Sequence, residues 1–216
     1  MKKMKKTLST LFLSSALLLA ACANDQDTTD NISTTDDADT TEEVVDETTV
    51  EETTDDAEIA EQVEVTMLNS DGEESGTATF TETEDGVTLN YSFSGLPEGE
   101  FGMHIHETGL ATAPDFSDAD SHWNPSDVEH GINSETGPHL GDLPNIVVDS
   151  SGEVSGEELL EGATLAEEAP EGKYSLHNGG QGTALIVHDG TDDYESQPTG
   201  DAGDRQLGGV IIPKSE

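Results

Sequence analysis

From Gln62 onwards the chain consists of short apolar and β-branched runs, and this pattern limits its fold more than any other feature. Turn signals such as Asp71-Gly72 and Asp85-Gly86 separate the runs, and no convincing amphipathic helix accompanies them. Roughly eight strands in about 155 residues predict an antiparallel all-β barrel or sandwich. The runs cover residues 62–68, 76–83, 87–94, 101–107, 145–149, 154–160, 184–188 and 209–212.

The composition limits both the size of the core and the class of partner. Hydrophobic residues make up 31% of the chain and aromatic residues 4%, so we expect one modest core and one folded domain, residues 61–216. The 216 residues carry 48 acidic and 7 basic side chains, a formal charge of −41. Such a surface repels phosphate groups, which disfavours nucleic-acid binding and polybasic membrane docking as functions.

The N-terminus has the pattern of an export signal, residues 1–21. Four lysines lie within the first six residues, and an apolar run from Leu8 to Ala21 follows them. Fourteen residues are short for a permanent transmembrane helix, which needs roughly 20. The run ends in Leu19-Ala20-Ala21-Cys22, which resembles the bacterial lipobox, where the cysteine is lipidated and the chain is cut just before it. Cys22 is the only cysteine, so we predict lipidation here; an ordinary secretory signal with an incidental cysteine is the alternative.

Residues 22–60 are predicted to form an acidic, threonine-rich disordered tether. From Ala23 to Ala60 the chain has neither proline nor glycine and too little apolar surface to offset the entropy of ordering. A flexible chain of that length spans about 35 Å root-mean-square. We expect it to act as a solvated spacer.

Histidines are concentrated in a long segment without a strand, from Thr108 to Gly141, and at its edges. Loops of this length inside a compact domain are usually functional or disordered. Two histidines lie two positions apart at the end of a predicted strand, so both face the same side and can reach one ion. The others, with an aspartate close behind, could surround a second ion; three imidazoles with a carboxylate suit Zn²⁺, and four imidazoles suit Cu²⁺. The five histidines within 36 residues are His104, His106, His122, His130 and His139, and the aspartate is Asp142.

These segments closely resemble the copper,zinc superoxide dismutases, and in particular the bacterial secreted lipoprotein branch. The matching segments are GMHIHETG (102–109), APDF (113–116), HWNP (122–125), HG (130–131), GPHLGDLPN (137–145), LIVHDGTDD (185–193) and GDAGDRQLGGVI (200–211). The resemblance covers about residues 62–213. It implies an eight-stranded Greek-key β-barrel, similar to an immunoglobulin sandwich, with a long metal-binding loop.

The resemblance also implies a role for each matching residue. Copper would be bound by His104, His106, His122 and His188, and zinc by His122, His130, His139 and Asp142. His122 would bridge both ions and carry a proton to the product, and Arg205 would guide the anion. The family also has an aspartate behind the ligands, which corresponds to Asp192 or, one residue on, to Asp193. His177 falls outside this set and is interpreted as structural.

Two departures from the family pattern stand out. The family ties its metal loop to the barrel with a disulfide, and its cysteines correspond to Ala111 and Gly208 here. We therefore expect the loop to depend more on zinc for its order. In addition, the segment between His188 and Arg205 has six acidic residues and no lysine, so the cationic rim that attracts superoxide in many relatives is not evident.

The resulting prediction is a lipid-anchored, extracytoplasmic bacterial superoxide dismutase that converts superoxide to dioxygen and hydrogen peroxide through Cu(II)/Cu(I) cycling. Its partners would be superoxide and, through the lipid on Cys22, the membrane; no protein partner is evident. A non-enzymatic lipoprotein that stores copper or zinc on the same scaffold is the main alternative, and a purely structural domain is another.

Overall fold

The computed structural model describes residues 61–216, and the leader and tether predicted for residues 1–60 lie outside the described residues. The described part consists of strands, loops and two short 3₁₀ turns, η1 (Ser117–Ala119) and η2 (Asn178–Gly180). None of its helices is long and apolar enough to cross a membrane. The strands are β1 (Gln62–Asn69), β2 (Glu74–Glu82), β3 (Gly86–Ser94), β4 (Gly99–Phe101), β5 (Met103–His106), β6 (Ile146–Val148), β7 (Glu153–Glu161), β8 (Ala163–Thr164), β9 (Tyr174–Ser175), β10 (Thr183–His188) and β11 (Arg205–Ile212).

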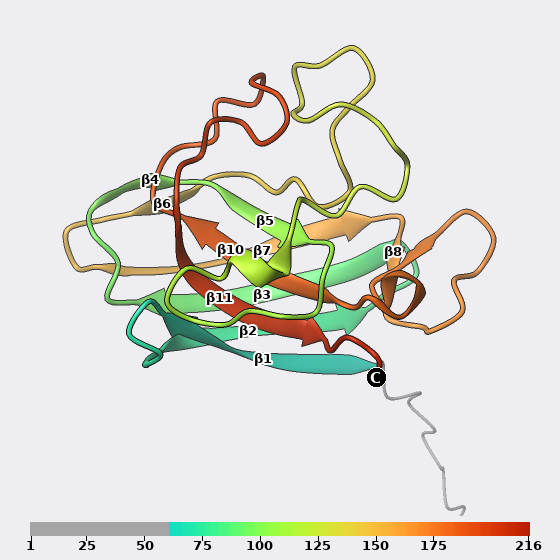
Figure 1. Cartoon of the computed structure of the whole chain (residues 1–216), viewed down its shortest axis with the longest axis horizontal. Helices are drawn as coiled ribbons and strands as arrows, with labels where there is room; N and C mark the ends of the chain where they lie inside the picture. The colour runs from blue at the N-terminus through green and yellow to red at the C-terminus, as the bar shows by residue number, and fades with distance from the viewer. Residues whose placement is uncertain (1–60) are drawn as a thin grey trace, which may run out of the picture. The chain divides into compact units, whose positions relative to one another are not determined.

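Seven of the strands form one antiparallel sheet that curls around the core (Figure 1). Their order is β5-β10-β11-β1-β2-β3-β7. Strands β4 and β6 form a separate pair. Along the chain, β4 immediately precedes β5 and β6 immediately precedes β7, the two edge strands of the large sheet. Alternating apolar residues, such as Val65 and Met67 on β1, face the buried core. The predicted all-β class is confirmed.

The structure differs from the sequence prediction at two places. The predicted strand 101–107 is broken at Gly102, whose carbonyl accepts a hydrogen bond from His188 N–H at 2.8 Å. The chain changes partner there, since β4 pairs with β6 whereas β5 pairs with β10. The short parallel pair β8–β9 was not predicted, because two-residue strands carry no periodicity that a sequence can show.

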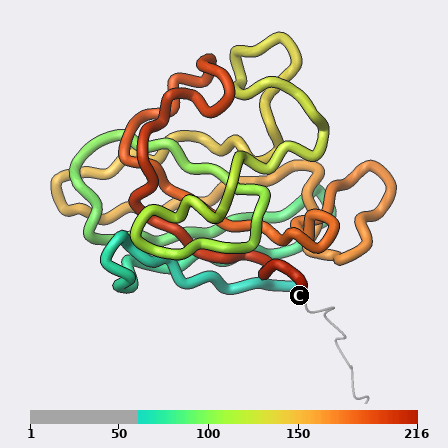
Figure 2. Tube along the Cα trace, in the orientation of Figure 1, coloured from blue at the N-terminus to red at the C-terminus, as the bar shows by residue number. Residues whose placement is uncertain are grey.

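Two long loops lie at the same end of the curled sheet (Figure 2). One joins β5 to β6 and contains only the turn η1; the other joins β10 to β11. The side chain of Gln197 ties them together, because its Oε1 accepts from His130 N–H at 2.8 Å and its Nε2 donates to the His130 carbonyl at 2.9 Å. This end of the barrel carries the candidate site.

Candidate metal centre

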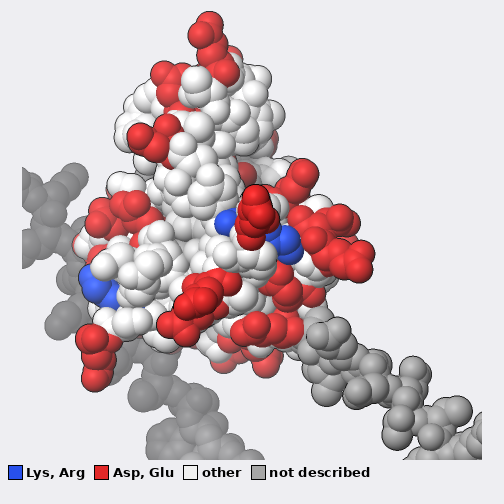
Figure 3. All heavy atoms as spheres, turned by 90° about the vertical axis from the view of Figure 1, so that its right-hand side faces the viewer, with Lys and Arg blue, Asp and Glu red and all other residues white. Residues whose placement is uncertain are grey.

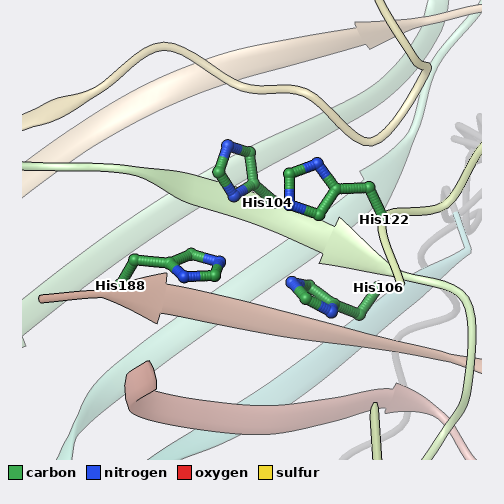
Figure 4. A group of neighbouring side chains, drawn as sticks. All are labelled: His104, His106, His122 and His188. Carbon is green, nitrogen blue, oxygen red and sulfur yellow. The ribbon is translucent and has the colours of Figure 1, made fainter. Parts of the chain in front are cut away.

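Two strands and the β5–β6 loop bring four buried imidazoles together. β5 carries two of them, β10 ends on the third, and the loop supplies the fourth. One ring nitrogen of each lies within 4.8 Å of the other three. Figure 4 shows the four rings gathered around a common space: they belong to His104, His106, His122 and His188.

Backbone pairing brings the loop histidine to the strand. β5 lies antiparallel to β10 along one edge. Along its other edge the loop returns, with Trp123 N–H donating to the Ile105 carbonyl at 2.8 Å. A β-bridge then sets His122 opposite His106. The four rings therefore start from backbone that the sheet holds in place.

Each of these rings has one engaged nitrogen and one free nitrogen. The engaged atoms are His104 Nε2 (2.8 Å from Asp192 Oδ2), His106 Nδ1 (2.8 Å from the Asp120 carbonyl), His122 Nδ1 (2.9 Å from Asp142 Oδ1) and His188 Nδ1 (3.2 Å from the Gly203 carbonyl). The free atoms, buried and without a hydrogen-bond partner among the described residues, are His104 Nδ1, His106 Nε2, His122 Nε2 and His188 Nε2. Buried polar atoms are normally paired. Four unpaired nitrogens directed into one space fit a bound metal ion, and an all-imidazole set suits copper.

The second group surrounds the carboxylate of Asp142. The Nδ1 atoms of His122, His130 and His139 lie 2.9, 3.0 and 3.1 Å from its oxygens. Three imidazoles with one carboxylate form the donor set of a tetrahedral zinc site. His122 belongs to both groups, with Nε2 on the first side and Nδ1 on the second, so its ring can join two ions.

Asp142 also holds the backbone of its own loop. Its Oδ2 accepts hydrogen bonds from the N–H groups of Gly131 and His139, both at 3.0 Å. Gly131 has φ +89°, and an added Cβ would lie 2.1 Å from the Tyr194 carbonyl oxygen. Only glycine fits at this turn, and the turn places the Gly131 N–H within hydrogen-bond distance of the Asp142 carboxylate.

Asp192 connects the two groups from behind. Its side chain is buried; Oδ2 bonds His104 Nε2 at 2.8 Å, Oδ1 bonds His130 Nε2 at 3.0 Å, and Oδ1 also accepts from Tyr194 N–H at 2.7 Å. Asp193 is exposed and bonds Ser196 instead. The geometry therefore favours Asp192 over Asp193 as the residue that orients one histidine of each group.

The pKa values of the first group favour neutral rings. Burial lowers the pKa of His104 to about 3, against the opposing effect of its bond to Asp192. Burial likewise lowers the pKa of His188 to about 4 and that of His106 well below its usual value. Neutral imidazole is the form that binds a metal, so these three rings are ready ligands at neutral pH.

In the second group the charged forms of two side chains, His130 and Asp142, are favoured. Burial disfavours the charged form of His130, but its bonds to Asp142 and Asp192 outweigh burial and raise its pKa to about 9. Burial also opposes the charge on Asp142, yet hydrogen bonds from His122, His130 and His139 hold the pKa of this carboxyl well below its usual range. Without a metal, a cationic His130 beside the Asp142 carboxylate compensates the buried charge.

Arg205 begins β11 directly opposite His188 in the sheet. Its guanidinium donates to two loop carbonyls, those of Phe116 and Asp120. Burial lowers its pKa, whereas the carboxylates of Asp120, Asp115 and Asp118 favour its charged form. Arg205 therefore places a permanent positive charge beside the four-histidine group, among the carboxylates of Asp115, Asp118 and Asp120.

An open cleft of about 620 Å³ lies over this arginine. Acidic residues line it: Asp115, Asp189 and Asp204. The only basic residues in the described part are Arg205, Lys173 and Lys214, against 33 acidic ones. Figure 3 shows one face of the molecule on which acidic side chains far outnumber basic ones.

Sequence reasoning missed several residues that hold the site. Gln197 links the two loops, and the Asp120 carbonyl fixes the ring of His106. Phe116 is buried against Gly208, at a position where the family pattern has a cysteine. These contacts join residues far apart in the chain, so no local sequence pattern predicts them. His177 lies outside both ligand groups, and Cys22 lies outside the described residues.

Comparison with known proteins identifies relatives of this chain. Residues 74–211 match the family model described as copper/zinc superoxide dismutase. A protein of Aquifex aeolicus named superoxide dismutase [Cu-Zn] 2 is 42% identical over 146 residues, covering 67% of this chain and 83% of the relative. A protein of Caenorhabditis elegans named extracellular superoxide dismutase [Cu-Zn] is 35% identical over 144 residues, covering 63% of this chain and 60% of the relative.

A solved structure also resembles this protein. The crystal structure of a superoxide dismutase-like protein from Bacillus subtilis superimposes with a TM-score of 0.63 at 31% identity. The match covers 68% of this chain and 97% of that one.

Proposed function

The chain belongs to the copper/zinc superoxide dismutase family, and we propose that it carries out this family's reaction outside the cytoplasm with the two histidine groups described above. It is an oxidoreductase with copper and zinc as cofactors. Two superoxide anions and two protons give one dioxygen and one hydrogen peroxide. One superoxide is oxidised and the other is reduced.

One observation carries the assignment of residues: His122 turns a free Nε2 towards three other free ring nitrogens while its Nδ1 faces Asp142. We assign copper to His104, His106, His122 and His188, and zinc to His122, His130, His139 and Asp142. Bound copper supplies the one-electron chemistry by alternating between Cu(II) and Cu(I).

The protein supplies charge and a proton carrier. The Arg205 guanidinium pairs with the incoming anion, because Arg205 lies opposite His188 in the sheet and lines an open cleft. His122 Nε2 faces the same space and is the atom that takes up a proton and passes it to the reduced product. Asp192 keeps His104 and His130 in the orientation that both groups require.

A paired assay tests this function. The purified protein, loaded with copper and zinc, is analysed for metal content and then mixed with superoxide. We expect one copper and one zinc per chain and a superoxide decay that is proportional to the bound copper. Full metal loading without accelerated decay would favour the alternative, a metal-storing lipoprotein on the same scaffold.

We further propose that the protein is anchored to the outside of the cell membrane through a lipid on Cys22. The leader, the lipobox-like Leu19–Cys22 and the sole cysteine support this location. Two acyl chains hold a protein stably, whereas one holds it weakly. Residues 23–60 would act as the tether between the membrane and the domain.

Cell fractionation tests the anchor. Cys22→Ala should move the protein from the membrane fraction to the medium or leave an unprocessed precursor, and Ser15→Ala, a leader change that keeps the cysteine, should do neither. Membrane association and processing that survive Cys22→Ala would exclude lipid anchoring at this residue.

A further inference from the structure

Phe116 occupies the place where the family pattern has a cross-link. A Cβ atom added to Gly208 would lie 2.5 Å from Cδ1 and 2.9 Å from Cγ of the Phe116 ring. Real side-chain atoms do not approach so closely. The ring of Phe116 therefore fits over β11 only because residue 208 has no side chain.

The same ring joins the metal loop to the barrel. Phe116 is fully buried in a small apolar cluster that is separate from the main core. The cluster unites two loop residues with two residues of β10: its members are Phe116, Ala119, Ala184 and Ile186, with Ala111 and Ala113 packed against it. Ala111 is the second position at which the family pattern has a cysteine, so one apolar cluster spans both ends of the missing disulfide.

The backbone of Phe116 is unusual in a way that serves this contact. Its φ is +51° and its ψ +22°, the left-handed region, which a bulky side chain rarely adopts. Such a conformation persists only when the surroundings hold it. Phe116 N–H donates to the Thr112 carbonyl at 3.0 Å, and the Phe116 carbonyl accepts from Ala119 N–H at 3.1 Å.

The Phe116 carbonyl also accepts a hydrogen bond from Nη1 of Arg205. The other guanidinium nitrogen, Nη2, donates to the Asp120 carbonyl. That carbonyl in turn holds His106 Nδ1 at 2.8 Å. Residues 116–120 thus orient both the arginine and one of the four rings, and the buried ring of Phe116 packs this segment against β10 and Gly208 of β11.

We propose that Phe116 is a positioning residue: its ring, seated over Gly208, replaces the missing covalent link, and its carbonyl sets the direction of the Arg205 guanidinium. The part that concerns Arg205 rests on the proposed function, in which this arginine receives the anion. The part that concerns the loop does not depend on activity.

Anion binding and hydrogen exchange test the proposal together. The variants are Phe116→Ala, Phe116→Leu and Arg205→Ala, with Phe80→Ala as a matched control, since Phe80 is equally buried but lies in the main core. The affinity of the copper-loaded protein for azide, a small anion, is measured by visible absorption. Exchange of the Thr108 and Ala119 amides, both hydrogen-bonded within the loop, reports on loop order without any reaction.

Phe116→Ala should weaken azide binding roughly tenfold, the lower end of the effect of outer-shell residues on a metal site. It should also speed exchange at both loop amides. Phe116→Leu should recover most of both properties, and Phe80→Ala should lower the melting temperature while leaving both unchanged. Equal effects of Phe116→Ala and Phe80→Ala on azide binding and loop exchange would overturn the proposal.

A double-mutant cycle tests the contact itself. Gly208→Ala should lower the melting temperature in the parent protein, because its Cβ meets the ring, but raise it or leave it unchanged in the Phe116→Ala background. If Gly208→Ala lowered the melting temperature equally in the parent protein and in Phe116→Ala, the proposal would also be overturned. If instead Arg205→Ala leaves azide affinity unchanged, the role of Arg205 in the proposed function fails, while loop exchange and the cycle still decide the role of Phe116.

Discussion

Asp192 shows at the scale of one residue how the site is held together. One buried carboxylate bonds a histidine of each group, His104 at 2.8 Å and His130 at 3.0 Å. Both bonds use the ring nitrogen that faces away from the proposed ion. Asp192 therefore couples the orientation of the copper side to that of the zinc side without contacting either ion.

Asp192→Asn should lower the affinity for both metals by roughly 10- to 100-fold, the usual cost of losing such a partner. Asp193→Asn is the matched control, because Asp193 is exposed and bonds Ser196. Competition with a chelator, followed by metal analysis, measures both affinities. Equal affinities in the two variants would assign the orienting role to neither aspartate.

The sequence predicts ligands better than it predicts their supports. His104 and His106 alternate along a strand, and the spacing around His122 matches a known family, so the ligand residues can be proposed without a structure. The Asp120 carbonyl and the Phe116 ring cannot, because a backbone acceptor or a buried phenylalanine carries no local signature. The choice between Asp192 and Asp193 likewise required the hydrogen bonds of the fold.

At the scale of elements, the long β5–β6 loop has the least regular secondary structure for its length. It has one 3₁₀ turn and no strand over the stretch that supplies all four proposed zinc ligands. Asp142 is central to its order, because its carboxylate meets three imidazoles and two backbone N–H groups. With no disulfide available, this loop depends on Asp142, on zinc and on the packing of Phe116.

Asp142→Ala should therefore weaken zinc binding strongly and lower the melting temperature of the zinc-loaded protein by several degrees, as about 1–3 kcal/mol is lost for buried donors left unpaired. Glu129→Ala, an exposed change in the same loop, is the control. Calorimetry with and without a zinc chelator gives both quantities. An unchanged melting temperature with zinc still bound would show that Asp142 neither binds zinc nor orders the loop.

The strands themselves were predictable for a simple reason. Alternating runs such as residues 87–94 bury one face, so their period is visible in the sequence, and β3 occupies Gly86–Ser94 in the structure. The break at Gly102 and the pair β8–β9 were not visible, since both depend on which partner strand lies alongside. Long-range pairing, not local propensity, decides such details.

At the scale of the whole molecule, charge is the dominant feature. The described part carries 33 acidic and 3 basic side chains, and three acidic residues line the cleft over Arg205. The long-range field should repel superoxide, and attraction is confined to the proposed copper and to Arg205. Raising ionic strength from about 0.01 M to 0.15 M shortens the Debye length from roughly 30 Å to 8 Å, which screens distant acids more than a close arginine.

We therefore expect the rate of superoxide dismutation to stay constant or rise over this range of salt. Asp204→Asn, which removes one charge from the cleft, should raise the rate at low salt and flatten the dependence. Asp85→Asn, in the turn between β2 and β3, should change it little. A steep fall in the rate with added salt would mean that the fold attracts anions over long distances, which contradicts the expected repulsion of superoxide.

We assign copper to four histidines and zinc to a second group that shares His122 with them, and His188, which belongs only to the first group, distinguishes the two sites. The measurement is pulse radiolysis of the metal-loaded protein and of His188→Ala, with copper and zinc determined in the same samples. We expect the variant to keep its zinc but to lose more than about 100-fold in dismutase rate, because even outer-shell changes at metal sites cost about 10- to 100-fold. A variant that retained copper and a near-normal rate would contradict it.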